Sequence, residues 1–319
     1  MKINLALVGF GRVGRAFVRL VGEKRGFCRE VYGLDLDLRA VFNSRGAFFL
    51  EDERDFARLS SGSPVRPGRR GFWKPGLTLG EASRVWGRGP GVLVECTPTD
   101  IRDGEPGLGH MRLAMKNRWH VAAASKGALV LHFGSLMDTA ERNGVRLKFS
   151  AAAAAALPGL DVGCHSLAGS EILGIEGILT GTANFILDGM ERGASFGDAL
   201  REAQSLGIAE PDPSLDVDGW DTACKILLIS NAAAGTHFTL KDVRREGISH
   251  VSEKDFARAR ESGRVLKLLG RMTRNRGGCR ARVGVEAIEK THPLSTVSGT
   301  GKAVTFITDA MGSITVSGG

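Results

Sequence analysis

Three glycines near the start of the chain have a spacing that lets a protein backbone contact a phosphate. Gly9, Gly11 and Gly14 follow a short apolar run and precede a helical pattern over 15–23. In such a loop the first glycine permits a tight turn, the second lets the backbone approach a pyrophosphate, and the third lets the helix pack on the strand. A glycine-rich turn without a ligand is the alternative. The residues predicted to bind a dinucleotide are Gly9, Phe10, Gly11, Arg12, Val13 and Gly14.

A second group of residues bears on which dinucleotide is bound. Folds selective for NAD usually carry an acidic residue at the end of the second strand, on the ribose hydroxyl. Here the second apolar run ends at Asn43, Ser44 and Arg45, which do not repel a 2′-phosphate and include a cation that can bind one. Asp35 and Asp37 lie nearer the usual spacing, but we expect them to precede the strand. We therefore predict that Asn43, Ser44 and Arg45 bind NADP, with NAD as the alternative.

Five carboxylates lie within twelve positions in the second half of the chain. A calcium loop does not fit them, because the segment lacks the glycine and the terminal glutamate at EF-hand spacing. A solvated loop is the simplest interpretation of the cluster taken alone. Its members are Glu210, Asp212, Asp216, Asp218 and Asp221.

Lys225 follows Asp221 by four residues, so both side chains share one face of a helix. The helix continues through the apolar run 226–229 and is expected to be buried, where a lysine costs free energy unless it is paired. Two interpretations stay open. The pair is either a helix ion pair worth about 0.2–0.5 kcal/mol or a partly desolvated lysine that can pass a proton.

Lys126 follows the short apolar run 121–124, at the carboxyl end of a predicted strand, where open α/β sheets bind ligands. A solvent-exposed loop lysine is the alternative. The histidines have no ligand spacing, and the five cysteines are widely spaced without a CxxC pair. We therefore expect neither a metal site nor a disulfide framework.

The elements that must position these residues follow an alternating pattern in the first half of the chain. Apolar runs at 3–8, 38–42, 92–96 and 121–124 alternate with helical patterns, which predicts a doubly wound parallel sheet. The segment 51–91 is rich in Gly, Pro, Arg and Ser and is expected to have little regular structure. Helices are predicted over 111–117, 195–206, 222–234 and 255–269.

Six consecutive alanines after Ser150 mark a change in composition. We expect a Rossmann-like NAD(P)-binding domain over 1–149 and an α+β domain that supplies substrate groups over 150–319. The fold class is thus α/β with a second, α+β domain.

Composition excludes several other classes of protein. Hydrophobic residues make up 42% of the 319 residues, enough for a folded core. The net charge of +8 could indicate a nucleic-acid partner. However, the arginines are scattered and the chain has a single Tyr to stack on bases, so we expect no nucleic-acid partner. The sequence contains no run of about 18 apolar residues, so we expect no membrane span. A start without a signal peptide favours a reducing cytoplasm.

At this point the sequence resembles the homoserine dehydrogenase family over most of its length. The strongest part is the run from Gly177 to Leu187, GILTGTANFIL. It continues through Ser195-Phe196, Leu206-Gly207, Ala209-Glu210, Asp212-Pro213, Asp216-Val217-Asp218-Gly219-Trp220-Asp221 and Lys225. The glycine loop, Glu95-Cys96-Thr97-Pro98-Thr99, Gly104-Glu105-Pro106, Ser125-Lys126-Gly127 and His292-Pro293-Leu294 add to it.

The resemblance implies the reduction of L-aspartate 4-semialdehyde to L-homoserine with NAD(P)H, in the route to threonine and methionine. It implies that Lys225 is the proton donor with Asp221 as its partner, and that Lys126 lies beside the reacting centre. The remaining implied roles are substrate binding by Glu210, Asp216, Gly181 and Thr182, and nicotinamide contact by Thr97 and Pro98. The resemblance also implies a homodimer formed through the second domain.

The chain departs from the family pattern at several positions. Ser125 stands where the family has Asn before the lysine, and we keep it among the cofactor-binding residues. Ile208 replaces a Tyr. Ser150 and six alanines replace a segment with a glutamate and glycines, which removes a ligand for a monovalent cation, so no metal is expected. Reverting Ala154 and Ala156 to glycine is expected to raise turnover. The printed chain also ends before the helix that closes the family's fold.

Two rival functions remain open from the sequence. One is a dehydrogenase for another amino-acid semialdehyde on the same fold. The other is a weakly active or non-catalytic NADP-binding paralogue. Turnover of homoserine and its dependence on the amino group separate these from the predicted enzyme.

Overall fold

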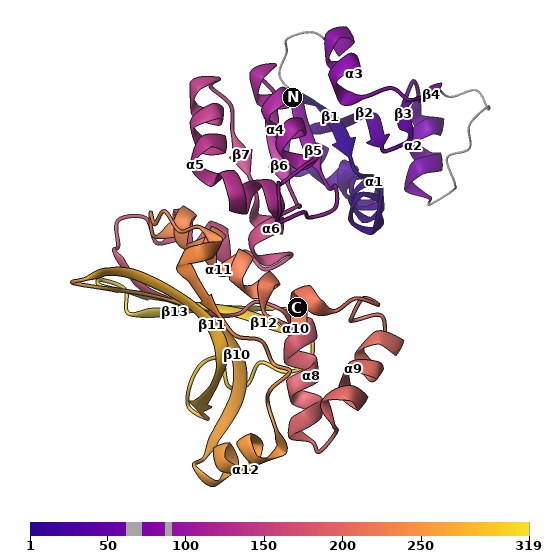
Figure 1. Ribbon diagram of the computed structural model, residues 1–319. Coiled ribbons are helices and arrows are strands. Elements are labelled where there is room, and N and C mark those ends of the chain that lie inside the picture. Colours follow the sequence, from indigo (N-terminus) through magenta and orange to yellow (C-terminus); the bar gives the residue numbers. More distant parts are fainter. Residues whose placement is uncertain (62–71, 87–90, 319) are drawn as a thin grey trace. The chain divides into compact units, whose positions relative to one another are not determined.

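The structure is a computed structural model that describes residues 1–61, 72–86 and 91–318 (Figure 1). The chain divides into two compact units, Met1–Ala152 and Ala153–Gly319. The domain boundary expected between residues 149 and 150 lies three residues before this division. Each unit contains its own sheet, so each is described separately below.

The first unit alternates strands and helices. Its strands are β1 (Lys2–Val8), β2 (Asp35–Asn43), β3 (Gly46–Phe49), β4 (Phe72–Pro75), β5 (Gly91–Glu95), β6 (His120–Ala123) and β7 (Leu147–Lys148). Its helices are α1 (Arg12–Tyr32), α2 (Glu53–Ser60), α3 (Leu79–Trp86), α4 (Gly107–Lys116) and α5 (Gly127–Arg142). The sheet order is β4-β3-β2-β1-β5-β6-β7, and the pairs among β2, β1, β5, β6 and β7 are parallel.

The strand order of this sheet indicates where a ligand would bind. The chain fills positions on one side of β1 and then crosses to β5 on the other side, so the order reverses between these strands. Open α/β sheets bind ligands beyond the carboxyl ends of the strands at such a point. The predicted parallel sheet is confirmed, and the glycine loop follows β1 at this point.

The core of the first unit explains why β1 is a nearly continuous apolar run. Leu5 and Leu7 of β1 pack in one cluster with Val18 of α1 and Val94 of β5. A central parallel strand is covered on both faces, so it carries apolar residues without alternation. This packing fixes the position from which Gly9 leaves the sheet.

In this unit one predicted helix is confirmed but longer than expected, and the expectation for the segment 51–91 is wrong. The helix expected over 15–23 runs from Arg12 to Tyr32, and Gly33 ends it with φ +64°. The segment 51–91 contains α2, β4, α3 and the first residue of β5 rather than irregular structure. Its average composition concealed short periodic elements such as α2, whose amino end is capped by the Asp52 carboxylate. Residues 62–71 and 87–90 of that segment lie outside the described residues.

The second unit combines a mostly antiparallel sheet with helices. Its strands are β8 (Ile172–Ile178), β9 (Val243–Arg245), β10 (Arg264–Asn275), β11 (Gly278–Glu289), β12 (Lys302–Thr308) and β13 (Ser313–Gly318). Its longer helices are α8 (Gly181–Glu191), α9 (Phe196–Ser205), α11 (Trp220–Ala233) and α12 (Glu253–Glu261). Short helical segments are α6 (Ser150–Ala154), at the unit boundary, α7 (Gly159–Asp161), η1 (Val162–Ser166), α10 (Ser214–Val217) and η2 (Leu240–Asp242).

The sheet of the second unit has the order β13-β12-β8-β10-β11-β9. α8, α11 and α12 all contact β10, and α11 also contacts β8 and β11. α11 is buried nearly all round, from Thr222 to Asn231, as its apolar sequence predicted. The end of β8 therefore meets the start of β12 and the starts of α8 and α11 in this unit. The mixed α/β class with a second sheet is confirmed.

One predicted helix of this unit is half wrong. The pattern over 255–269 predicted one helix, but α12 ends at Glu261 and β10 begins at Arg264. Gly263, with φ +69°, separates them. The run from Val265 to Leu269 is apolar enough for either structure, and its pairing with β11 along the whole length of β10 decides for a strand. The helices expected over 111–117, 195–206 and 222–234 are confirmed within a few residues.

Among residues 1–61, 72–86 and 91–318, no helix is both long enough and apolar enough to cross a membrane.

Candidate active site

The three loop glycines meet different surroundings after β1. Gly9 has φ +90°, and a Cβ there would overlap the carbonyl oxygen of Cys96. A Cβ on Gly14 would overlap the carbonyl oxygen of Gly9, which shows how closely α1 packs on the turn. Gly11 differs, because no atom lies within 4 Å of the place its Cβ would take. Backbone at Gly11 is therefore open to a ligand.

The amino end of α1 is suited to an anion. Gly11 is its N-cap residue, no side chain caps the helix, and the first turn carries no acidic residue. The first N–H groups of the helix are therefore left for a ligand, and the helix dipole favours negative charge there. The open space at Gly11 and this uncapped end together fit the pyrophosphate of a dinucleotide. Arg12 and Val13 are exposed beside it, and Phe10 lies half-buried beneath the Arg15 guanidinium.

Asn43, Ser44 and Arg45 are exposed at the carboxyl end of β2, as expected. The side-chain oxygen of Asn43 accepts a hydrogen bond from the backbone N–H of Arg45 at 2.8 Å, which shapes the turn into β3. This is the edge of the sheet at which the glycine loop also lies, because β1 and β2 are parallel. The position agrees with contact to the ribose of a dinucleotide.

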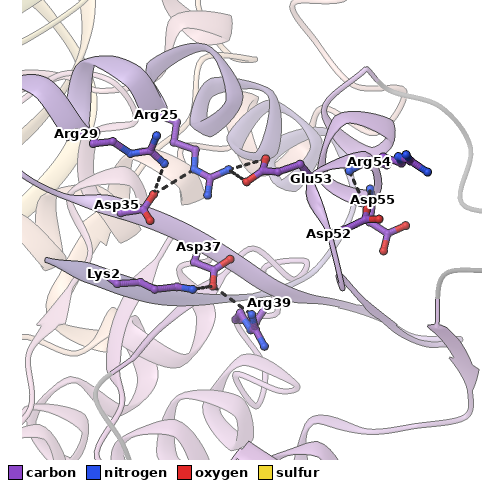
Figure 2. Close-up of polar contacts among 10 residues, drawn as sticks. All are labelled: Lys2, Arg25, Arg29, Asp35, Asp37, Arg39, Asp52, Glu53, Arg54 and Asp55. Atoms are coloured by element: carbon purple, nitrogen blue, oxygen red, sulfur yellow. Dashed lines mark hydrogen bonds and ion pairs between the residues drawn. The ribbon is translucent and has the colours of Figure 1, made fainter.

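We expected Asp35 and Asp37 to precede the second strand, and this is wrong. Both residues belong to the first part of β2 (Figure 2). They pair in register with Lys2 and Asn4 of β1, and this pairing extends β2 beyond its apolar run. Both therefore lie at the end of β2 opposite to Asn43.

Basic side chains neutralise both carboxylates (Figure 2). Arg29 and Arg25 contact Asp35, at 2.7 and 3.4 Å, and the hydrogen bond from Arg29 lowers the pKa of Asp35. Lys2 contacts Asp37 at 2.8 Å. Asp35 and Asp37 are thus paired at the opposite end of β2 from the glycine loop. Asn43 lies at the same end as that loop, so it remains the residue predicted to contact the cofactor ribose.

A buried glutamate that the sequence did not single out connects two of the predicted cofactor residues. Glu95 is fully buried at the end of β5. Its carboxylate accepts hydrogen bonds from the backbone N–H of Thr97 at 2.9 Å, from the Thr97 hydroxyl and from the Ser125 hydroxyl. Ser125 is thereby held beside Thr97, while Pro98 is exposed. In the sequence, a charged residue at the end of an otherwise apolar strand could have indicated that Glu95 has a role at the site.

Lys126 precedes the first residue of α5 and is half-buried. Its backbone N–H donates to the Thr99 hydroxyl at 3.2 Å, so the loops after β5 and β6 are joined here. Gly127 packs so closely on Asp100 that a Cβ would overlap the backbone of that residue. Lys126 thus lies with Thr97, Pro98 and Ser125 in the first unit.

The second unit contains the predicted lysine–aspartate pair. Lys225 and Asp221 lie one turn apart on α11, with 2.6 Å between Nζ and Oδ2, which confirms the predicted ion pair. Nζ also donates to the carbonyl oxygen of Leu179 at 2.7 Å. The lysine is 7% exposed, so this is not a solvated surface pair.

Thr180 supports this pair from the end of β8. Its hydroxyl donates to Oδ2 of Asp221 at 2.8 Å, the same oxygen that contacts Lys225. The hydroxyl of Thr222 lies 2.9 Å from that of Thr180. Sequence reasoning missed Thr180, although it immediately precedes the predicted residues Gly181 and Thr182.

The pair opens onto a cavity of about 280 Å³. Five predicted site residues line it, namely Gly181, Thr182, Asp216, Asp221 and Lys225. Ala155, Thr180, Ile208, Thr300 and Lys302 complete the lining. Glu210 is not among the lining residues, and its side chain is exposed.

Gly181 is required where α8 meets the loop before β12. A Cβ at Gly181 would lie 2.7 Å from the carbonyl oxygen of Thr300. The Asn184 amide donates to the carbonyl oxygens of Val297 and Gly299, at 3.2 and 3.0 Å. These contacts hold the loop against α8 beside the cavity wall at Thr300.

Lys302 is a second lysine of the cavity that the sequence did not indicate. It begins β12 and is half-buried. Burial lowers the pKa of Lys302, and the charge of Lys225 lowers it further, while Asp221 and Asp216 act in the opposite direction. The cavity thus combines two cations with two carboxylates.

The alanine run contributes one unusual backbone conformation. Ser150 to Ala154 form α6, and Ala155 then has φ +55°, a region that favours glycine. Ala155 also lines the cavity, whereas Ala154 is buried in the helix. The described residues contain no group of three or more His, Cys, Asp or Glu side chains that could hold a metal ion.

The chain is similar to known homoserine dehydrogenases. The homoserine dehydrogenase family model matches residues 158–319. The NAD(+)-dependent homoserine dehydrogenase of Pseudomonas canavaninivorans is 36% identical over 330 residues, covering 99% of this chain and 91% of that protein. The homoserine dehydrogenase of Methanocaldococcus jannaschii is 33% identical, covering 85% of this chain and 80% of that protein. The crystal structure of a homoserine dehydrogenase from Thiobacillus denitrificans matches with a TM-score of 0.84 at 26% identity, covering 100% of this chain and 69% of that one.

Proposed function

This chain belongs to the homoserine dehydrogenase family, and from that premise we propose that it interconverts L-homoserine and L-aspartate 4-semialdehyde with NAD(P). The observation that carries the proposal is the buried Lys225–Asp221 pair on a cavity that also contains Asp216. An amino-acid aldehyde needs a carboxylate for its ammonium group and a proton donor for its oxygen, and this cavity contains both.

The first unit is proposed to hold the cofactor. Its glycine loop, the turn Asn43–Arg45 and the loops at Thr97, Pro98 and Ser125 would bind it, and the nicotinamide supplies or accepts the hydride when bound. Asn43 and Arg45 favour NADP over NAD, because both Asp35 and Asp37 are paired at the other end of β2. The similar Pseudomonas protein is NAD(+)-dependent by name, so we keep NAD as the alternative.

Lys225 is proposed to give its proton to the substrate oxygen during reduction and to take it back in the reverse direction. Its ammonium group has three N–H donors, of which two are directed at Asp221 and the Leu179 carbonyl oxygen. One donor is left for the substrate. Asp221, held by Thr180, keeps Nζ at the cavity.

The substrate is proposed to bind at the cavity of the second unit. Asp216, and Glu210 from its exposed segment, would hold the ammonium group, with Gly181 and Thr182 as further contacts at the start of α8. Lys126 of the first unit would assist at the carbonyl or carboxylate group. These roles make residues 1–149 a nucleotide-binding domain and 150–319 a catalytic and dimerisation domain. We further propose a homodimer that acts in the cytoplasm.

The reaction is tested by following NADP⁺ reduction with L-homoserine and with 4-hydroxybutanoate, which lacks the amino group. We expect turnover of homoserine and a rate with 4-hydroxybutanoate lower by at least about 100-fold, because the proposed contact between Asp216 and the substrate's ammonium group is lost. Cofactor binding without turnover of either compound would contradict the proposal and favour a non-catalytic paralogue. Equal rates would favour a different dehydrogenase.

Cofactor preference is tested with Arg45→Ala. We expect the Kd for NADP⁺ to rise about tenfold, the loss of one charge-assisted contact, while the Kd for NAD⁺ stays unchanged and serves as the internal control. An equal change for both cofactors would exclude contact between Arg45 and a 2′-phosphate.

A further inference from the structure

The two lysines of the substrate cavity differ in their surroundings. Lys225 has partners in Asp221 and in the Leu179 carbonyl oxygen. Lys302 lines the same cavity, but it forms no hydrogen bond or ion pair with the residues of the described ranges. A half-buried ammonium group that forms no hydrogen bond costs free energy, and the charges of Asp221 and Asp216 act on Lys302 without forming one.

The position of Lys302 is fixed by the loop that precedes it. The backbone N–H of Gly301 donates to the Ser298 carbonyl oxygen at 3.0 Å, and β12 then pairs with β8 from Ala303 onward. The N–H of Gly299 donates to the carboxylate of Asp188 at 2.5 Å. Lys302 therefore begins its strand at a determined place on the cavity wall.

A buried lysine anchors this loop from beneath. Lys267 is 2% exposed, and its Nζ lies 2.9 Å from Asp188 and 2.7 Å from the Val297 carbonyl oxygen. The network of Lys267, Asp188 and Asn184 joins β10, α8 and the loop. These contacts hold the backbone just before Lys302 in place. A backbone held in this way, with a cation at the cavity that lacks a hydrogen-bond partner, is suited to binding an anionic group.

We propose that Lys302 binds the α-carboxylate of the amino-acid substrate. This inference rests on the proposed function, and it deepens it by defining the substrate class as α-amino acids with a free carboxylate. The two lysines then have separate tasks, because Lys225 acts at the reacting oxygen and Lys302 holds the opposite charge of the zwitterion. Asp216 on the same cavity complements the ammonium group.

The test compares Lys302→Met, which removes the charge, with Lys302→Arg, which keeps it. The substrates are L-homoserine and L-homoserinamide, in which a neutral amide replaces the carboxylate. We expect Lys302→Met to raise KM for homoserine about 10- to 100-fold, with kcat changed by less than about threefold, and to leave KM for homoserinamide unchanged. Lys302→Arg should recover most of the loss. Lys290→Met, at an exposed lysine of the same unit, is the matched control.

Two results would overturn the inference. One is an equal rise of KM for both substrates, and the other is a loss of kcat at unchanged KM, which would mean that Lys302 acts on Lys225 through its charge. Calorimetric titration with L-homoserine gives an independent readout, because Lys302→Met must weaken its Kd by the same factor. Wild-type protein that binds homoserine without turning it over would refute the proposed reaction and leave the Lys302 comparison decisive.

Discussion

Oδ2 of Asp221 is a shared acceptor, since it receives the Thr180 hydroxyl at 2.8 Å and lies 2.6 Å from Nζ of Lys225. A carboxylate fixed in this way holds the lysine at the cavity. The same lysine donates to the carbonyl oxygen of Leu179, so its position is determined by α11 and by the residue that follows β8. The orientation of Lys225, the proposed proton donor, therefore depends on the side chains of Asp221 and Thr180 and on one backbone carbonyl group.

Thr180→Val tests this orientation at the residue scale. Valine keeps the shape of threonine but removes the hydroxyl, so one acceptor site on Asp221 loses its donor. We expect kcat for homoserine to fall about tenfold, with KM little changed. Thr180→Ser, which keeps the hydroxyl, is the control and should retain most of the activity. Similar losses in both variants would show that packing of the threonine methyl, and not its hydroxyl, is what matters.

The residues of the site were predictable in proportion to how local their contacts are. Asp221 and Lys225 lie one helical turn apart, and their pairing follows from spacing alone. Thr180 reaches Asp221 across 41 positions, and Lys302 enters from β12, so only the order of strands in the sheet brings them together. Glu210 was grouped with Asp216 by sequence, but its side chain is exposed and does not line the cavity.

At the scale of elements, two glycines at the start of α1 have different roles, one in packing and one in the proposed cofactor binding. A Cβ at Gly14 would overlap the Gly9 carbonyl oxygen, whereas at Gly11 it meets nothing within 4 Å. Gly14→Ala is therefore expected to lower the Tm by several degrees. Gly11→Ala should fold with an unchanged Tm but bind NADP⁺ at least about tenfold more weakly, because the methyl group occupies ligand space. Gly11→Ala with normal NADP⁺ affinity in a binding titration would contradict the assignment of this loop.

The turn after α6 gives a second prediction at this scale. Ala155 has φ +55°, where a Cβ is unfavourable, so Ala155→Gly should raise the free energy of unfolding by about 1 kcal/mol. Ala154→Gly is the matched control in the adjoining helix and should lower it by about 0.5–1 kcal/mol. Urea denaturation of both variants measures the difference. A loss of stability in Ala155→Gly would mean that this backbone conformation carries no strain.

Element boundaries were hardest to predict where a segment is apolar without a clear period. The run after Gly263 continues the pattern of α12 in sequence, yet it forms β10 because β11 pairs with it from Arg264 to Asn275. Such pairing is not encoded within the segment itself. The glycine loop was predictable because its strand, turn and helix are consecutive in the sequence.

At the scale of the whole molecule, each unit has its own core, Leu7 and Val18 belonging to one and Ile178 and Leu269 to the other. Substitutions in the cavity of the second unit are therefore not expected to disturb the glycine loop of the first. The first unit was the more predictable, because parallel strands and their connecting helices alternate along the chain. The second unit depends on pairing between strands far apart in sequence, such as β8 with β12.

The proposed homodimer is a prediction at the same scale. Light scattering coupled to size-exclusion chromatography should give twice the 33.9 kDa of one chain at micromolar concentration. The mass should not change between about 0.1 and 1 M NaCl if apolar burial holds the dimer together. A mass of one chain across that range would contradict the dimer without bearing on the chemistry of the cavity.

The most direct test of the central claim is homoserine-dependent NADP⁺ reduction by the wild type and by Lys225→Ala, with Lys241→Ala at an exposed lysine as the control. If Lys225 transfers the proton, its loss should lower kcat about 10²- to 10⁴-fold. The Kd for NADP⁺ should stay unchanged, because the glycine loop belongs to the first unit. A Lys225→Ala variant that keeps wild-type kcat would contradict the account.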